Sequence, residues 1–187
     1  RALAAADALA GLAGDRHQAA WQVARREPAR PLLPVGNAEP SLPLLTAPTE
    51  GANIVADYAS LGLTLRRHPL ALLRARLAAL GLLSAAAVAA TAPGRLVHGA
   101  GLVINRQRPA AANQVTFVTL EDETGQLNLV VWQQVAARHR ATLLGARLLG
   151  VSGRVQRTAG VTQLLATELT DYSDLLGALL VRARDFR

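Results

Sequence analysis

Consecutive carboxylates at Glu121, Asp122 and Glu123 are the residues of this chain best placed for acid or metal chemistry. Carboxylate oxygens bind Mg²⁺, and bound Mg²⁺ can promote phosphoryl transfer. The same residues lead into Thr124-Gly125, and acidic side chains at such a turn commonly stabilise the backbone of a hairpin. This cluster could therefore be a metal site or part of a turn, and we favour the turn.

Other arrangements that could support catalysis are poor. The histidines lie far apart without paired ligand spacing, and they are His17, His68, His98 and His139. Cysteine is absent, which excludes disulfides and thiolate metal sites. His68 directly precedes Pro69, a position that suits entry into a helix. We therefore predict no catalytic residue, no metal ligand and no cofactor within this chain.

Composition favours a folded chain with a polyanionic partner. The hydrophobic content of 51% is enough to bury a core, and no apolar run approaches the roughly 20 residues that cross a bilayer. The formal charge is +7 and every one of the 20 basic residues is Arg, which attracts nucleic acid but also fits a base-biased genome. The chain opens at Arg1 within a helical pattern, so we expect a piece of a longer, cytoplasmic protein.

Prolines and helix-capping residues along the chain predict five segments. Six of the nine prolines fall between Pro28 and Pro48, a density that excludes helix interiors and central strands. Helical patterns at Leu3–Leu9 and Arg16–Arg26 precede this stretch, and patterns capped at Asn53 and opened by Pro69 follow it. The predicted segments are 1–27 helical, 28–52 Pro-rich linker, 53–92 helical connector, 93–172 barrel domain and 173–187 carboxy-terminal helix and tail.

From Arg95 onward the hydrophobic period changes to two, which predicts strands. The predicted strands are Leu96–Asn105, Gln114–Glu121, Gln126–Trp132, Arg147–Arg157 and Val161–Thr170, with a helix over Gln133–Leu144 between the third and the fourth. Gly99 and Gly101 would let the first strand coil sharply; they do not form a dinucleotide fingerprint, because no third glycine and no helix follow. This order predicts an α+β protein, a small helical segment followed by a five-stranded OB-fold β-barrel.

Alternation along the central hairpin separates a core face from a binding face. Side chains of a strand point to opposite sides in turn, so Val118 and Leu120 should face inward while Phe117 and Thr119 face outward. On the third strand, Asn128 and Trp132 then lie outward, beside Phe117. The rings of Phe117 and Trp132 could stack on bases or simply pack against neighbouring elements.

Arginines near the first loop and the last hairpin flank this outward face, where they could follow a phosphate backbone. The candidate nucleic-acid-binding residues are Arg106, Arg108, Phe117, Thr119, Asn128, Trp132, Arg154 and Arg157. Arg66, Arg67, Arg74 and Arg76 form a second basic edge, on the helical connector, which we favour as a solvated face over a phosphate-facing one.

Several runs of this sequence resemble bacterial family C DNA polymerases, and in particular their error-prone branch. The runs are 101–103, 106–109, 117–125 and 143–151 in the predicted barrel, 57–70 upstream of it, and 5–23, which is similar to the end of the family's helix-hairpin-helix region. Arg67 stands where the family usually has a small residue before His-Pro-Leu. The family's metal-binding phosphoesterase-like domain and its palm aspartates have no counterpart here, so we do not expect this piece to polymerise DNA.

The resemblance implies a carboxy-terminal, nucleic-acid-binding part of an enzyme that extends primers past DNA lesions. The parent polymerase would carry Mg²⁺ in its active site, and this part would hold single-stranded template DNA. Error-prone members are thought to use accessory proteins of the mutagenesis cassette to reach the sliding clamp. A helix with Leu175, Leu176, Leu179 and Leu180 could dock such a protein or, as we favour, cap the barrel.

Other functional classes remain open at this point. The barrel and the Pro-rich segment could form a protein-interaction module of the mutasome that contacts no DNA. An anticodon-binding extension of a tRNA synthetase would also use an OB barrel, although the His68-Pro69-Leu70 region does not suit it.

Overall fold

The computed structural model describes residues 1–25, 45–109, 115–158 and 160–179. Two compact units are present, Arg1–Leu65 and Arg66–Arg187. Parts of the predicted elements lie outside the described residues, namely Arg26, the linker from Pro28 to Pro43, Gln114, Leu180 and the Arg-rich tail.

The first unit is helical and is held together by a buried ion pair. Its helices are α1 (Ala2–Ala5), α2 (Ala10–Ala13), α3 (Arg16–Arg25) and α4 (Glu50–Leu61). The buried Arg16 of α3 pairs with Asp57 of α4 and also donates from Nη1 to the Asn53 carbonyl at 3.2 Å. Because a buried charge is costly unless it is paired, this contact fixes α3 against α4.

Two predictions for the first unit were wrong in detail. A single helix over Leu3–Leu9 does not form, because Asp7 has a positive φ of 59° and separates α1 from α2. A left-handed residue cannot continue a helix, and Asp tolerates that conformation better than most residues. The cap of α4 is Thr49, whose Oγ1 accepts a hydrogen bond from the Ala52 N–H at 3.2 Å, and it is not Asn53.

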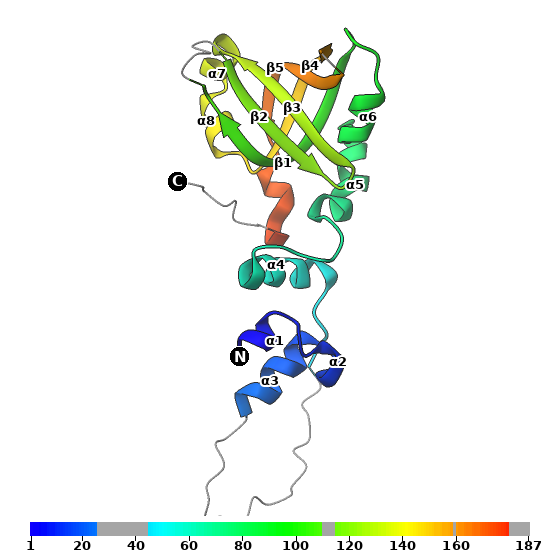
Figure 1. Ribbon diagram of the computed structural model, residues 1–187, viewed down its shortest axis with the longest axis vertical. Coiled ribbons are helices and arrows are strands. Elements are labelled where there is room, and N and C mark those ends of the chain that lie inside the picture. Colours follow the sequence, from blue (N-terminus) through cyan, green and yellow to red (C-terminus); the bar gives the residue numbers. More distant parts are fainter. Residues whose placement is uncertain (26–44, 110–114, 159, 180–187) are drawn as a thin grey trace, which may run out of the picture. The chain divides into compact units, whose positions relative to one another are not determined.

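The second unit contains a closed five-stranded barrel with the strand order β1-β2-β3-β5-β4. Its strands are β1 (Leu96–Gln107), β2 (Val115–Asp122), β3 (Gly125–Trp132), β4 (Leu148–Thr158) and β5 (Val161–Asp171) (Figure 1). Neighbours pair antiparallel except β3 and β5, which are parallel. The predicted α+β class and five-stranded barrel are confirmed.

Helices close the barrel at both ends. The helices are α5 (Pro69–Ala79), α6 (Ala85–Ala90), α7 (Gln133–Arg138), α8 (Arg140–Gly145) and a 3₁₀ segment, η1 (Ser173–Leu179). Val88 of α6 and Leu143 of α8 both join the core that fills the barrel, and Figure 1 shows their helices on opposite sides of it. The prediction of a single helix over Gln133–Leu144 was wrong, because the helix is interrupted at His139, between α7 and α8.

The carboxy-terminal segment packs on the second unit. Leu176 of η1 is 2% exposed and shares a hydrophobic cluster with Leu70 and Leu77 of α5 and with Leu148 of β4. The expectation that this segment caps the barrel locally is therefore met at Leu176.

One strand closes the barrel by serving two neighbours. β1 pairs with β4 from Leu96 to Leu102 and with β2 from Leu102 to Gln107. At the bend, a Cβ on Gly101 would lie only 2.8 Å from the Cβ of Leu120, so β1 and β2 approach more closely than a side chain permits. A similar close approach occurs at Gly153 of β4, where a Cβ would lie 2.6 Å from the Leu165 carbonyl oxygen of β5.

We expect Gly153→Ala to destabilise the barrel by about 1–3 kcal/mol, because the new methyl group meets backbone that cannot move aside. Urea denaturation followed by circular dichroism measures the change. Gly145→Ala is the matched control, since a Cβ there meets nothing within 4 Å. A Gly153→Ala variant as stable as the Gly145→Ala variant would show that the close approach imposes no constraint.

Candidate nucleic-acid interface

The outer face of the β2–β3 hairpin carries the residues that alternation predicted. Phe117 lies opposite Val130, Thr119 lies opposite Asn128, and Val115 lies opposite Trp132. The ring-bearing side chains are open to solvent, with Phe117 40% and Trp132 50% exposed. The inward residues of the same hairpin are buried, and they are Val118, Leu120, Leu127, Leu129 and Val131.

A row of amide and hydroxyl side chains runs across all five strands on this outer face. In lateral order the row consists of Asn105 (β1), Thr119 (β2), Asn128 (β3), Gln163 (β5) and Gln156 (β4), each in register with the next. Thr119 Oγ1 donates to Asn128 Oδ1 at 3.2 Å, and Gln163 Nε2 donates to Gln156 Oε1 at 3.3 Å. We call these five residues the polar row; its groups can both donate to and accept from a base edge.

An adjacent row is mainly apolar and ends in a cation. This row lies two residues away from the polar row along each strand. In lateral order it consists of Gln107, Phe117, Val130, Leu165 and Arg154, each in register with the next. Val130 is only 7% exposed, although alternation along β3 places it on this face, and its strand partners are Phe117 and Leu165. The outer face thus sets a stacking ring beside a line of hydrogen-bonding groups.

The sequence predicted only part of the polar row. Thr119 and Asn128 belong to one hairpin, so their proximity follows from local alternation. Asn105, Gln156 and Gln163 were missed because their neighbours are set by strand pairing over long separations in sequence. The sequence signal that could have revealed the whole polar row is an outward polar residue at the matching position of every strand.

Arg106 and Arg157 contact helix carbonyls beside the barrel. The guanidinium of Arg106 donates from Nε to the Leu143 carbonyl at 2.6 Å and from Nη2 to the Ala146 carbonyl. Arg157 Nη2 donates to the Ala89 carbonyl of α6 at 2.8 Å. Unpaired carbonyls at helix ends are acceptors that such side chains satisfy. Both arginines therefore position helices.

The register explains why Arg106 does not share the outer face with Phe117. Val103 pairs with Leu120 but Asn105 pairs with Thr119, so Ile104 is an extra residue in a β-bulge. A bulge shifts the alternation of every residue after it. Arg106 consequently lies opposite the inward Val118, where unbroken alternation would have placed it beside Phe117.

The remaining two predicted arginines lie at opposite edges of the outer face. Arg154 is exposed at the β4 end of the apolar row and donates from Nη1 to the Gly94 carbonyl at 3.0 Å. Arg108 is exposed and directly follows β1, next to Gln107. Arg154 therefore sets positive charge at the β4 end of the row that contains Phe117, and Arg108 follows the residue at the β1 end of that row in sequence.

The acidic cluster at the β2–β3 turn holds the hairpin to the helices. Asp122 Oδ1 accepts hydrogen bonds from the Thr124 N–H at 2.7 Å and from Thr124 Oγ1 at 2.6 Å, which is the turn role that we favoured. Its Oδ2 accepts from the Ala85 N–H at 2.7 Å and from Arg74 Nη2 at 3.0 Å. Among the described residues, no group of His, Asp and Glu is arranged to hold a metal ion.

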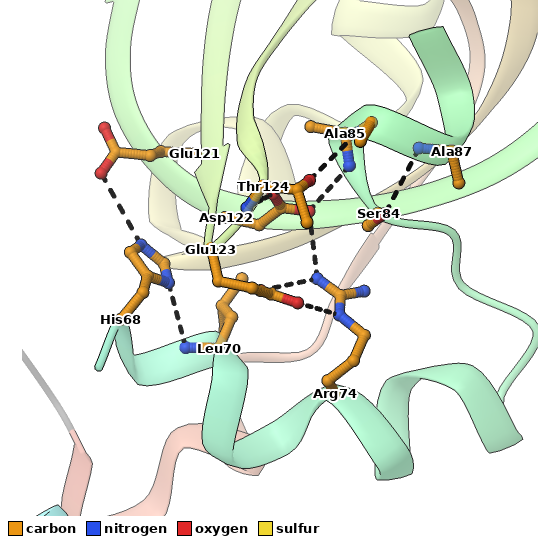
Figure 2. Close-up of polar contacts among 11 residues, drawn as sticks. His68, Leu70, Arg74, Ser84, Ala85, Ala87, Glu121, Asp122, Glu123 and Thr124 are labelled. Atoms are coloured by element: carbon orange, nitrogen blue, oxygen red, sulfur yellow. Dashed lines mark hydrogen bonds and ion pairs between the residues drawn. The ribbon is translucent and has the colours of Figure 1, made fainter. Parts of the chain in front are cut away.

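Arg74 joins this turn to α5, as Figure 2 shows. Its Nε and Nη2 donate to the two carboxylate oxygens of Glu123, a two-point contact that strengthens an Arg–carboxylate pair. The hydrogen bond from Arg74 lowers the pKa of Glu123, and the same bond raises the pKa of Arg74. The expectation of a solvated face was therefore wrong for Arg74, because the hairpin turn covers it.

His68 closes the other side of the same contact. Its Nδ1 accepts from the Leu70 N–H at 3.1 Å and caps α5, which confirms the helix-entry role, while its Nε2 lies 3.7 Å from Glu121 Oε1 (Figure 2). Burial lowers the pKa of His68, and the neighbouring carboxylates, Glu121 first, partly oppose that shift. The imidazole is thus held mainly neutral in the fold near neutral pH.

Comparison with known proteins identifies this chain's relatives. Residues 97–172 match the family of OB-fold nucleic acid binding domains. The chain is 59% identical over 184 residues to the error-prone DNA polymerase of Alkalilimnicola ehrlichii, covering 98% of this chain and 18% of that protein. It is 50% identical over 186 residues to the error-prone DNA polymerase of Methylococcus capsulatus, covering 100% of this chain and 18% of that protein.

The chain belongs to the error-prone DNA polymerase family. It spans less than a fifth of the length of these relatives, 18% in both cases. The family resemblance found in the sequence is thereby confirmed. Among solved structures, asparaginyl-tRNA synthetase from Pyrococcus horikoshii has a TM-score of 0.40 at 24% identity, covering 48% of this chain and 22% of that one.

The family relationship gives the described surface a context. The match places an OB-fold nucleic acid binding domain over the five strands of the barrel. Within the described ranges, every helix is too short or too polar to cross a lipid bilayer.

We expect Arg74→Gln to destabilise the second unit by about 1.5–3 kcal/mol, because Asp122 and Glu123 lose charge-assisted hydrogen bonds. The Asp122 side chain is 1% exposed, so water cannot replace the lost donor. Thermal and urea denaturation measure the loss. Arg76→Gln, at an exposed position on the same helix, is the control and should change stability by less than about 0.5 kcal/mol. Equal effects of the two substitutions would remove the structural role of Arg74.

We also expect the free energy of unfolding to fall as the pH drops below 6.5, the ordinary pKa of a histidine such as His68. Folding lowers the pKa of His68, so at acidic pH the unfolded chain binds the proton more readily than the folded chain. Protonation therefore stabilises the unfolded state and lowers the free energy of unfolding. His68→Asn keeps a capping acceptor but does not titrate, and it should remove this part of the pH dependence. Urea midpoints measured across the acidic range test this, and identical pH profiles for both proteins would contradict it.

Proposed function

We propose that this part of an error-prone DNA polymerase binds single-stranded template DNA on the outer face of its barrel. The observation that carries the proposal is the exposed ring of Phe117 set beside the polar row. Unpaired bases offer a flat face for stacking and free edges for hydrogen bonds, and this surface meets both needs in adjacent rows.

The chemistry of binding follows from the two rows. Phe117 stacks on one base, and Trp132, two positions along the opposite strand, is open to a second. Thr119 and Asn128 then reach base edges, since amide and hydroxyl groups can donate or accept as each base requires. Such contacts suit a template strand, whose sequence varies, because stacking on an aromatic ring tolerates every base.

Phosphate groups of the strand would meet Arg108 and Arg154 at the two edges. The formal charge of +7 on the whole chain adds a long-range attraction for the same polyanion. Arg106 and Arg157 take part indirectly in this proposal, because they fix α8 and α6 at the two ends of the barrel. Binding should therefore weaken as salt rises.

The wider role belongs to the parent enzyme. We propose that the whole polymerase synthesises DNA across lesions during DNA damage repair in the cytoplasm, with Mg²⁺ in an active site outside this chain. Holding the template strand near that site would keep it single-stranded and correctly placed. Accessory proteins of the mutagenesis cassette would then connect the enzyme to the sliding clamp.

We expect Phe117→Ala to weaken binding of a fluorescein-labelled oligothymidylate by about 5- to 150-fold, since one stacked base contributes about 1–3 kcal/mol. Fluorescence anisotropy at low salt measures the affinity. Leu80→Ala is the matched control, because Leu80 is a half-exposed apolar residue outside the barrel, 50% exposed against 40% for Phe117.

The result that would overturn the proposal is an absence of binding at low salt, or a Phe117→Ala variant that binds like the Leu80→Ala variant. In the first case, pull-down of mutasome proteins with and without nuclease would favour a protein-interaction module. A strong preference for tRNA over single-stranded DNA would instead favour the anticodon-binding alternative.

A further inference from the structure

A pocket of about 370 Å³ lies where β1 leaves the barrel and β2 enters it, beside α7 and α8. Its walls come from the end of β1, the start of β2 and the two helices, all within the second unit. This volume falls in the range of sites that enclose small ligands. Arg106 and Arg108 line this pocket and are among the eight candidate binding residues predicted from the sequence. The sequence did not predict the pocket itself.

Positive charge dominates the polar part of this pocket. Arg106, Arg108 and Arg140 line it, and no carboxylate lies among the described residues of its wall. Arg140 is exposed at the start of α8. The positive charge of Arg140 at a concave surface favours a ligand with an anionic group.

The rest of the wall is mainly apolar. Val115, Ala136, Leu143 and Leu144 contribute hydrocarbon surface, and Gln133 adds an amide. Leu144 is 62% exposed, a large apolar side chain left open to solvent at this position. An apolar wall next to cations fits a ligand that joins a flat, weakly polar ring to an anionic group.

The pocket borders the outer face of the barrel. Gln107 lines the pocket and lies opposite Phe117 in the β1–β2 register, and Val115 lines it and lies opposite Trp132. A strand stacked on Phe117 and Trp132 therefore leads directly to this opening.

We propose that the pocket receives one nucleotide of the bound single strand, with its phosphate at Arg140 and its base against Val115 and Leu144. This inference rests on the proposed function and deepens it, because it adds a subsite beyond the stacking face. Arg106 takes a positioning role here, since it holds the Leu143 and Ala146 carbonyls and thereby fixes the wall that carries Arg140.

The test uses salt dependence of oligothymidylate binding to the full chain. Each phosphate contact on a single strand contributes about 0.7 to the slope of log affinity against log salt. Arg140→Gln should lower the slope by about that amount. Arg138→Gln is the matched control, because it removes the same charge from the neighbouring helix at an exposed residue that does not line the pocket.

The outcomes separate the two proposals. If the unaltered chain binds, Phe117→Ala weakens binding, and Arg140→Gln behaves like Arg138→Gln, then the pocket proposal is overturned and template binding stands. If the unaltered chain does not bind at all, both fail. Denaturation of each variant, expected to match the unaltered chain, shows that the slopes report binding and not unfolding.

A second readout needs no oligonucleotide. Thymidine monophosphate added to the chain should shift the NMR signals of the Gln133, Ala136 and Ala137 amides, and Arg140→Gln should remove those shifts. Thymidine and inorganic phosphate, each carrying half of the ligand, should give smaller shifts. Shifts from inorganic phosphate as large as those from the nucleotide would overturn the role of the apolar wall, and no shifts would overturn the site.

Discussion

Closure of the barrel by a single shared strand is the constraint on which the proposed binding surface depends. β1 pairs with β4 along its first half and with β2 along its second, and the change of partner falls at Leu102. Register across the closed barrel aligns the polar row with the row that contains Phe117. A slip of one residue in any strand would turn its contribution inward.

Charge pairing beside the barrel stabilises the hairpin that carries the surface. Arg74 holds Asp122 and Glu123 of the β2–β3 turn against α5, and Asp122 also accepts a hydrogen bond from the first N–H of α6. The acidic residues that looked suited to metal chemistry therefore anchor the hairpin on which we propose that DNA binds. On its outer face the rings of Phe117 and Trp132 are exposed, at 40% and 50%.

Local patterns predicted the fold class and the central hairpin well. Period-two alternation needs only neighbouring residues, so the buried Val118 and Leu129 and the exposed Phe117 followed from sequence. Long-range register did not: the parallel β3–β5 pairing places Gln163 beside Asn128, and the bulge at Ile104 turns Arg106 toward the interior. Likewise, the partner of Arg74 lies 49 residues away, a separation that no helical pattern reveals. The helix breaks at Asp7 and His139 were missed because neither residue is a strong breaker.

Photo-crosslinking locates the bound strand most directly. A single strand containing iododeoxyuridine, irradiated with the full chain and mapped by mass spectrometry, should attach to Phe117 or Trp132 on the barrel. Crosslinks confined to Trp21 of the first unit, with none on the outer face, would contradict template binding at the barrel.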